Sequence, residues 1–338
     1  MLKPLLHKTA LHAERFASRW TDRTGTGRAI DPNIGYATPD NIVLRGRVLS
    51  ALRHSAAQPG QSKLANLRQI AGMFLTDEVR DATVQSEGVS TKTDEEGYFT
   101  LLLPRDGQSG WSTRDVTVDD EDNSVACPVL IPADNARFMV ISDIDDTMLE
   151  TGAYSLAKNL YTSFTGNAGS RRVFPDSIDL MQSLSDVGRN PVYYVSSSPW
   201  NLHDFLADIF ERTGLVRGPM FLRDLGLSAT KFVTEGHGNH KGGSIDTLLA
   251  ANPDLPAILL GDTGQHDAHI YRKVIERHPG RILAVGLRTP GAGIDVNDAK
   301  DIAALKTSDV PTFAARDFTE FGKFVATAHP QHFDKADT

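Results

Sequence analysis

Residues 138–149 read Phe-Met-Val-Ile-Ser-Asp-Ile-Asp-Asp-Thr-Met-Leu, and this stretch decides the fold. Its apolar first half is typical of a buried strand, and the strand ends in three aspartates and a threonine. Two carboxylates at ~4 Å from each other repel by roughly 4 kcal/mol at an effective dielectric constant of 20. A strand end that carries Asp143, Asp145 and Thr147 therefore indicates an active site in which a cation or a proton relieves the repulsion.

The sequence around this strand predicts a parallel sheet. Apolar runs alternate with helical patterns along the chain: strands at 138–142, 192–196, 257–260 and 282–287, and helices near 176–187, 201–212, 242–251 and 267–277. Strands separated by helices form parallel sheets that helices cover on both faces, and ligands bind at the carboxyl ends of their strands. We therefore expect a Rossmann-like α/β catalytic domain over residues 135–330, with its site at that edge of the sheet.

The sequence before residue 135 predicts a different architecture. Short β-prone runs separated by turn residues, interrupted by one helical pattern at 62–75, indicate a small β-sandwich over 36–134; the runs lie at 41–49, 88–93, 98–103 and 114–118. The segment 91–99 resembles the turn and strand of transthyretin-like sandwiches. Residues 1–35 are predicted to be a helical segment that packs its apolar face on the protein itself, with contact to a membrane surface as the alternative.

Composition limits the classes of function. The chain has 338 residues, and 35 Lys and Arg against 43 Asp and Glu give a net charge of −8, which argues against sequence-independent nucleic-acid binding. Cys127 is the single cysteine, so no intrachain disulfide can form, and a structural thiol in a reducing compartment is expected. No apolar run predicts a signal sequence or a transmembrane segment. We expect a cytoplasmic enzyme, with peripheral membrane contact as the alternative.

Three further motifs follow predicted strands or open predicted helices. The string Ser196-Ser-Ser-Pro-Trp200 places hydroxyls and backbone N–H groups where an anion can bind. Lys241 opens the helix at 242–251 and can point a fixed positive charge at the same edge. The strand at 257–260 ends in Gly261-Asp-Thr-Gly-Gln-His-Asp267, a glycine turn with two more carboxylates. Each motif alone suits a cap, a surface lysine or a turn, but their shared placement favours one site.

This set of side chains is suited to phosphoryl transfer through an aspartyl-phosphate. Asp143 is the expected nucleophile, and Asp145 the acid that protonates the leaving oxygen and later activates water. Ser196 would donate a hydrogen bond to a phosphoryl oxygen, and Lys241 would balance the charge of Asp143 and the phosphoryl group.

The same strand ends predict a magnesium site. Mg²⁺ would bind the carboxylates of Asp143 and Asp262 and the backbone carbonyl of Asp145, and would keep several waters. Thr147 and Asp267 are expected to support the site, Asp267 by holding metal-bound water or Lys241.

These motifs resemble those of the haloacid dehalogenase (HAD) superfamily, which are an apolar strand with DxDxT, a strand ending in Ser or Thr, a lysine, and a strand with GD followed by another aspartate. Three fuller strings are similar to the actin-patch phosphatidate phosphatase family: Ser142-Asp-Ile-Asp-Asp-Thr147, Tyr194-Val-Ser-Ser-Ser-Pro-Trp200 and Gly261-Asp-Thr-Gly-Gln-His-Asp267. The resemblance implies Mg²⁺-dependent dephosphorylation of phosphatidate to diacylglycerol.

The insertion between the first two motifs bears on the substrate. Residues 150–175 are too few for a large independent cap, so we expect a small cap insertion and a mouth open to a bulky or membrane-bound substrate. Four residues are candidates for binding phosphate or headgroup charge: Ser197, Arg171, Arg172 and Arg223.

Several alternatives stay open at this stage. The same catalysis on a soluble phosphometabolite or a phosphoprotein fits the motifs equally well, and a non-catalytic adaptor fits them less well. A zinc site is possible by spacing from four histidines: His237, His240, His266 and His269. A calcium loop at Asp143 is excluded, because Met148 and Tyr154 occupy the positions where that loop has glycine and glutamate. The ligand of the sandwich and the oligomeric state do not follow from the sequence.

Overall fold

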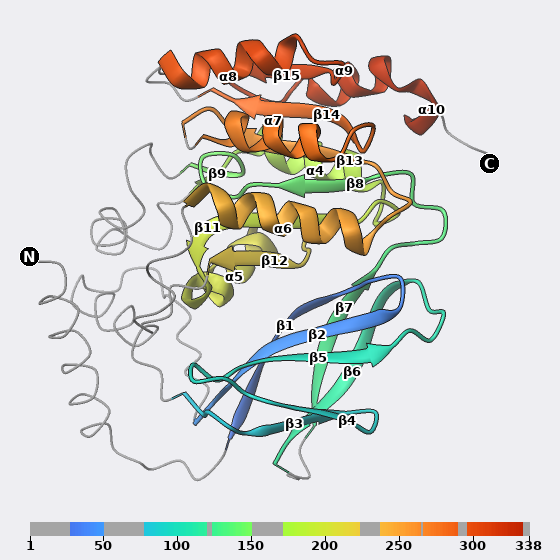
Figure 1. The fold of residues 1–338 in the computed structure, drawn as a ribbon, viewed down its shortest axis with the longest axis vertical. Helices are drawn as coiled ribbons and strands as arrows, with labels where there is room; N and C mark the ends of the chain where they lie inside the picture. Colours follow the sequence, from blue (N-terminus) through green and yellow to red (C-terminus); the bar gives the residue numbers. More distant parts are fainter. Residues whose placement is uncertain are drawn as a thin grey trace, which may run out of the picture.

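A computed structural model shows a small β-domain next to an α/β domain (Figure 1). The structure describes residues 28–50, 78–119, 124–150, 172–223, 237–264, 266–289 and 296–333. The predicted helix at 62–75, most of the predicted N-terminal helical segment and most of the insertion at 150–175 lie outside these ranges. Among the residues described, no helix is both long enough and apolar enough for a membrane crossing.

The α/β domain contains a six-stranded parallel sheet in the order β12-β11-β8-β13-β14-β15. The strands are β8 (Met139–Ser142), β11 (Val192–Pro199), β12 (Met220–Arg223), β13 (Ala257–Asp262), β14 (Ile282–Arg288) and β15 (Thr312–Ala315). Every residue of β8 is buried, because helices cover both faces of the sheet. The predicted α/β fold is confirmed, and the strand that decided it lies inside the sheet between β11 and β13.

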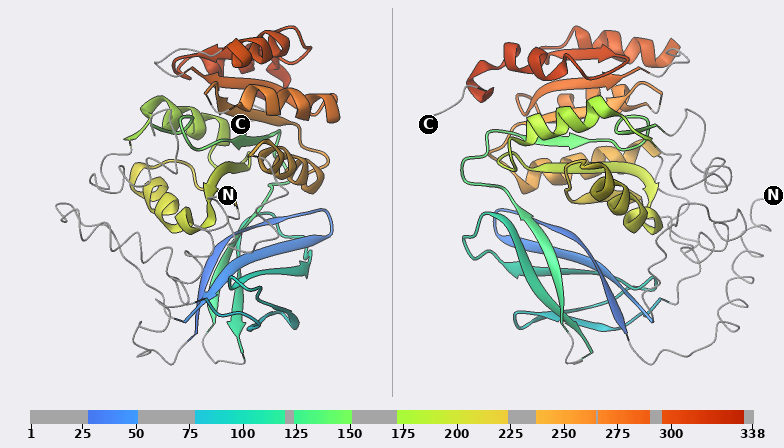
Figure 2. Two further views of the ribbon diagram at one scale, coloured as in Figure 1. Left: turned by 60° about the vertical axis from the view of Figure 1, so that its left-hand side comes forward. Right: turned by 180° about the vertical axis from the view of Figure 1, so that it is seen from behind.

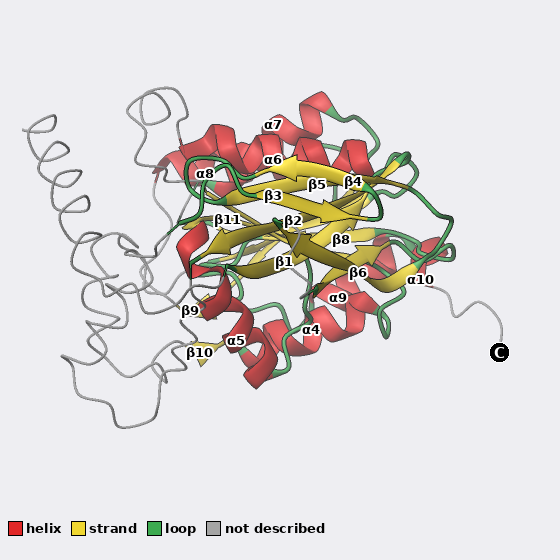
Figure 3. Ribbon diagram, turned by 90° about the horizontal axis from the view of Figure 1, so that it is seen from below, coloured by secondary structure: helices red, strands yellow, loops and turns green. Residues whose placement is uncertain are grey.

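Helices cover both faces of this sheet (Figure 3), and each face has its own hydrophobic core. Three helices pack on one face: α4 (Pro175–Ser185), α5 (His203–Thr213) and α9 (Phe321–Ala328). Three others pack on the opposite face: α6 (His237–Ala251), α7 (Asp267–Arg277) and α8 (Val296–Lys306). The short elements η1 (Trp200–Leu202), β9 (Leu149–Glu150), β10 (Arg172–Val173) and α10 (Pro330–Phe333) complete this domain.

The β-domain is formed by one seven-stranded sheet in the order β4-β3-β6-β7-β1-β2-β5. Its strands are β1 (Ala29–Ala37), β2 (Asn41–Leu49), β3 (Thr83–Ser86), β4 (Val89–Lys92), β5 (Tyr98–Pro104), β6 (Gly110–Val118) and β7 (Val125–Ile131). The sheet curls until the terminal strands β4 and β5 lie side by side, so the predicted sandwich is a nearly closed barrel around one core. Strand β1 includes residues 29–35, which the sequence assigned to the N-terminal helical segment.

The β-domain lies next to the α/β domain (Figure 2), and the half-buried Arg45 connects the two. Arg45 lies in β2 and donates a hydrogen bond to the carbonyl of Met220, in β12, at 3.3 Å. Three aromatic rings surround it, with centroids 4.4–5.5 Å from Cζ: Phe221, Tyr36 and Trp200. Burial lowers the pKa of Arg45 to about 10. The β-domain is thus packed against β12 and against Trp200, the residue that ends the serine string.

Candidate active site

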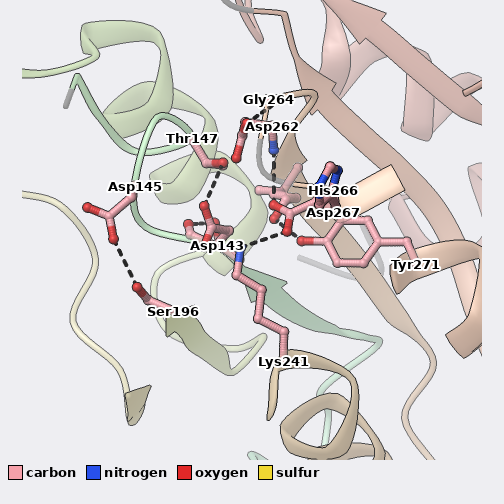
Figure 4. A network of polar contacts seen from close by, with 12 residues as sticks. Asp143, Asp145, Thr147, Ser196, Lys241, Asp262, Gly264, His266, Asp267 and Tyr271 are labelled. Carbon is pink, nitrogen blue, oxygen red and sulfur yellow. Dashed lines mark hydrogen bonds and ion pairs between the residues drawn. The ribbon is translucent and has the colours of Figure 1, made fainter. Parts of the chain in front are cut away.

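The strand-end motifs meet at the carboxyl edge of the parallel sheet (Figure 4). Asp143 directly follows β8, Ser196 lies in β11 and Asp262 ends β13, and these three strands are neighbours in the sheet. Lys241 reaches the same place from α6. The structure therefore brings together side chains that lie far apart in the sequence, as the parallel topology predicts.

Lys241 lies between two carboxylates. Its Nζ is 2.8 Å from Oδ1 of Asp143 and 2.6 Å from Oδ1 of Asp267. Burial alone would lower the pKa of Lys241. The negative charges of Asp143, Asp267 and Asp262 outweigh this effect, so the pKa of Lys241 lies above its ordinary value. The lysine therefore stays charged at every physiological pH.

Asp143 is held at both oxygens. The hydroxyl of Thr147 donates to Oδ2 at 3.1 Å, and Lys241 lies beside Oδ1. The side chain is 1% exposed, and this burial raises the pKa of Asp143 to about 8; Lys241 opposes the shift, while Asp267 and Asp145 add to it. A second positive charge at the site would restore the ionised carboxylate that a nucleophile requires.

Asp145 faces the serine string. The hydroxyls of Ser196 and Ser198 both donate to its Oδ2, at 2.9 and 2.6 Å. The N–H of Ser198 donates to Oγ of Ser196 at 2.9 Å, which fixes the loop that carries both hydroxyls. Ser196 therefore lies beside Asp145, as its place after the predicted strand indicates, and Ser198, for which we predicted no separate role, is a second donor to the same oxygen.

The turn after β13 depends on Gly261. The N–H of Asp262 donates to Oδ2 of Asp267 at 3.2 Å, and the N–H of Gly264 donates to Oδ1 of Asp262 at 2.5 Å. A Cβ at position 261 would lie 2.6 Å from Oδ2 of Asp267 and 2.7 Å from the hydroxyl of Tyr271. Only glycine lets the backbone approach these groups so closely.

Three buried carboxylates form a group that could hold a metal ion: Asp143, Asp262 and Asp267, with ligand atoms all within 4.8 Å of one another. Lys241 is the cation paired with this group, so three negative charges against one positive leave a net charge of −2 when all are ionised. Burial raises the pKa of Asp262 well above its ordinary value, and Asp267 and Asp143 add to the shift. Oδ2 of Asp262 is buried and has no hydrogen-bond partner among the residues described. Oxygen ligands with this excess charge suit a divalent cation such as Mg²⁺.

The group differs in one member from the predicted ligand set. The carboxylate group includes Asp267, whereas the predicted third ligand was the backbone carbonyl of Asp145. The carboxylate of Asp145 accepts hydrogen bonds from Ser196 and Ser198 instead. No histidine belongs to the group found in the described part of the chain. Instead, Nδ1 of His266 lies 3.2 Å from Asp298, and Nδ1 of His269 lies 3.3 Å from Asp301.

The structure describes only some of the predicted substrate-binding residues. Arg223 ends β12 in register with Pro199, beside the serine string, and Ser197 is half-buried. Arg172 begins β10, and Arg171 lies outside the described residues. Their contact with a substrate stays a prediction.

Comparisons with known proteins agree with this geometry. Residues 138–289 match the family described as phosphatidate phosphatase APP1, catalytic domain. Phosphatidate phosphatase APP1 of Saccharomyces cerevisiae is 26% identical over 233 residues, which cover 67% of this chain and 38% of that protein. An uncharacterized protein of Schizosaccharomyces pombe is 24% identical over 228 residues, which cover 64% of this chain and 37% of that protein. The chain thus spans less than two fifths of the length of these curated relatives.

A solved structure of a carbohydrate acetylesterase from Xanthomonas citri aligns with 90% of this chain and 75% of its own. The sequence identity is 11% and the TM-score is 0.31, values too low to support a common fold or function.

Proposed function

Residues 138–289 belong to the family of the phosphatidate phosphatase APP1 catalytic domain, a phosphatase domain, and from this premise we propose the reaction that the chain catalyses. It is a Mg²⁺-dependent phosphatase that hydrolyses a phosphomonoester through an aspartyl-phosphate, with phosphatidate as substrate and diacylglycerol as product. The observation that carries the proposal is Asp143, a buried carboxylate that Thr147 and Lys241 hold and that belongs to a group of three carboxylates with more negative charge than Lys241 can balance. The order of the motifs also supports membership of the HAD superfamily.

In the first step Asp143 attacks phosphorus, and the bond from phosphorus to the ester oxygen breaks. Asp145 gives its proton to the leaving oxygen, which departs as the alcohol of the lipid. The hydroxyl of Ser196 is expected to turn to a phosphoryl oxygen, because Ser198 provides Asp145 with a second donor. Lys241 neutralises the carboxylate and the phosphoryl group as charge moves between them.

In the second step water attacks the aspartyl-phosphate and Asp145 accepts its proton, which regenerates Asp143 and releases phosphate. Asp143, Asp262 and the carbonyl of Asp145 would hold Mg²⁺, which would supply electrostatic stabilisation of the phosphoryl oxygens. Asp267 holds Lys241 with one oxygen and the turn after β13 with the other.

The wider setting is part of the same proposal. We propose an enzyme domain at 135–330 preceded by the β-domain, predicted at 36–134 and extended by β1 to residue 29, in a cytoplasmic protein that meets its lipid substrate at a membrane surface. Arg223, Arg171, Arg172 and Ser197 are the candidates for binding the headgroup.

The test compares phosphate release from vesicles that contain phosphatidate with release from a panel of soluble phosphomonoesters and a phosphopeptide, each with Mg²⁺ and with EDTA. Asp143→Asn and Asp145→Asn are compared with Asp254→Asn, a change of an exposed loop carboxylate. We expect Mg²⁺-dependent release from the vesicles, loss of release in the first two variants and retention in the third. Turnover by Asp143→Asn refutes the aspartyl-phosphate. Release from the soluble esters alone favours a phosphometabolite or phosphoprotein phosphatase, and no release from any substrate favours the adaptor.

A further inference from the structure

Arg288 is a buried arginine at the edge of the site, and the sequence analysis predicted no role for it. It is the last residue of β14 and pairs in register with Asp262, the last residue of β13. Its side chain is 4% exposed. Its backbone carbonyl accepts a hydrogen bond from the N–H of Thr263 at 2.9 Å, which anchors the chain where it leaves Asp262.

The guanidinium of Arg288 binds three separate segments of the domain. Nε donates to the carbonyl of Thr147 at 3.0 Å, and Nη1 donates to the carbonyl of Arg316 at 3.1 Å. Nη2 donates to Oδ2 of Asp176 at 2.6 Å and to Oγ of Ser177 at 2.7 Å. The hydroxyl of Ser177 in turn donates to the carbonyl of Thr147 at 3.1 Å. The carbonyl of Thr147 therefore accepts two hydrogen bonds. One comes from Arg288 itself, and the other comes from the hydroxyl of Ser177, which Arg288 orients.

Two aromatic rings complete the surroundings of this arginine. The rings of Phe174 and Phe318 lie 4.0 and 4.5 Å from Cζ of Arg288. A planar guanidinium suits this place, because it can pack against rings while its donors point along fixed directions in its plane. A lysine at position 288 would keep the charge near Asp176 but could not serve Thr147 and Arg316 together.

We propose that Arg288 is a positioning residue for the nucleophile Asp143, acting through Thr147. The hydroxyl of Thr147 donates to Oδ2 of Asp143, so a Thr147 carbonyl fixed by Arg288 also fixes the backbone that carries this hydroxyl. The described hydrogen bonds of the Arg288 guanidinium go to Thr147, Arg316, Asp176 and Ser177, and to no member of the carboxylate group. The expected effect of Arg288 on turnover rests on the proposed function. The effect of Arg288 on metal binding can be measured independently of that function.

The experiment uses the full chain and compares Arg288→Met, Arg288→Lys and Ser177→Ala with a matched control, Arg281→Met. Arg281 immediately precedes β14, at the opposite end of the same strand from the site. Its Nη2 likewise donates to backbone carbonyls, those of Leu249, Asn252 and Leu255, at 3.2, 2.7 and 3.0 Å. For each variant we measure kcat and KM on phosphatidate vesicles, Mg²⁺ affinity by titration calorimetry, and Tm by circular dichroism.

We expect Arg288→Met to lower kcat and Mg²⁺ affinity by roughly 10- to 100-fold, as loss of a group that orients metal ligands does elsewhere. KM should stay within about threefold, because no contact with substrate is lost. Arg288→Lys should recover only part of kcat, and Arg281→Met should lower Tm while it keeps kcat and Mg²⁺ affinity.

A folded Arg288→Met protein with the kcat and Mg²⁺ affinity of the wild type overturns the inference, as does an equal loss in Arg281→Met. If Arg288→Met does not fold, Ser177→Ala decides: a reduced kcat at unchanged KM supports the role of the Thr147 carbonyl, and an unchanged kcat overturns it. A wild-type protein that binds Mg²⁺ without hydrolysing any ester refutes the proposed function, and the Mg²⁺ titrations still decide the role of Arg288. A wild-type protein that neither binds Mg²⁺ nor hydrolyses any ester overturns both the proposed function and the role of Arg288.

Discussion

The substitution Asp143→Asn is predicted to stabilise the metal-free protein while it abolishes turnover. In the folded state, burial raises the pKa of Asp143 from its ordinary 3.8 to about 8. Lys241 lowers this pKa, whereas Asp267 and Asp145 raise it further. A carboxyl whose folded pKa is raised favours folding fully below pH ~4, and this contribution is lost as the pH rises to ~8. Asparagine has the same shape and no such proton to lose.

The magnitude follows from the difference between the two states. At pH 7 the unfolded chain has lost the proton of Asp143, while the folded chain has kept it. Each pH unit above the unfolded pKa costs about 1.4 kcal/mol, which makes roughly 4 kcal/mol at pH 7. Because the amide is expected to contact Nζ of Lys241 less closely than the carboxyl does, we expect a net stabilisation of about 2–4 kcal/mol at pH 7 and almost none near pH 4.

The assay is urea unfolding in EDTA at several values between pH 4 and pH 8, followed by circular dichroism and tryptophan fluorescence. Asp254→Asn, at an exposed loop position, serves as the control and should leave the free energy of unfolding unchanged at every pH. Saturating Mg²⁺ should stabilise the wild type more than Asp143→Asn, because the variant lacks a charged ligand. An Asp143→Asn protein that is no more stable than the wild type at pH 7, or whose advantage does not change with pH, contradicts the reasoning.

Four other changes test neighbouring parts of the structure. Mg²⁺ affinity of the wild type, measured by calorimetry, should rise by roughly tenfold per pH unit between pH 6 and 8, because binding displaces a proton from the nucleophile. Ser198→Ala should lower kcat by about 10-fold through the loss of one buried hydrogen bond, since Asp145 keeps one of its two serine donors. Gly261→Ala should destabilise the fold by about 1–3 kcal/mol in urea unfolding and remove activity, whereas Gly243→Ala, in open space on α6, should stabilise it by up to about 1 kcal/mol. Arg45→Met should lower the free energy of unfolding by about 2–4 kcal/mol, because it leaves the carbonyl of β12 and three rings without their partner.

The strands near the site could be predicted from the sequence because each is buried on both faces and therefore reads as a continuous apolar run. β8, β11, β13 and β14 all have this property. Two of the strands that were missed, β1 and β15, lack it. β1 contains Pro32 and alternates polar with apolar residues, and β15 is half-buried throughout. A loop can show the same patterns, so these segments can be recognised as strands only when the neighbouring strands are known.

The principal residues of the site could be predicted for a similar reason, since parallel topology places strand ends together whatever the details of packing. The contacts that hold them could not. Ser198 donates to Asp145 across 53 positions of sequence, and Arg288 donates to Thr147 across 141. A serine within a serine string and an arginine after a strand carry no pattern that indicates these partners. They depend on how α4 and the last strands pack, which only the folded structure shows.

The geometry also separates the roles of the two carboxylates in the turn after β13. Both oxygens of Asp267 are occupied, Oδ1 by Lys241 and Oδ2 by the N–H of Asp262. Asp262 accepts the N–H of Gly264 with Oδ1, and its Oδ2 is buried without a hydrogen bond from the described residues. A buried carboxylate oxygen in that state is costly unless it is protonated or binds a cation. Asp262 is therefore the better candidate for a metal ligand, and Asp267 for the residue that holds Lys241 against the nucleophile.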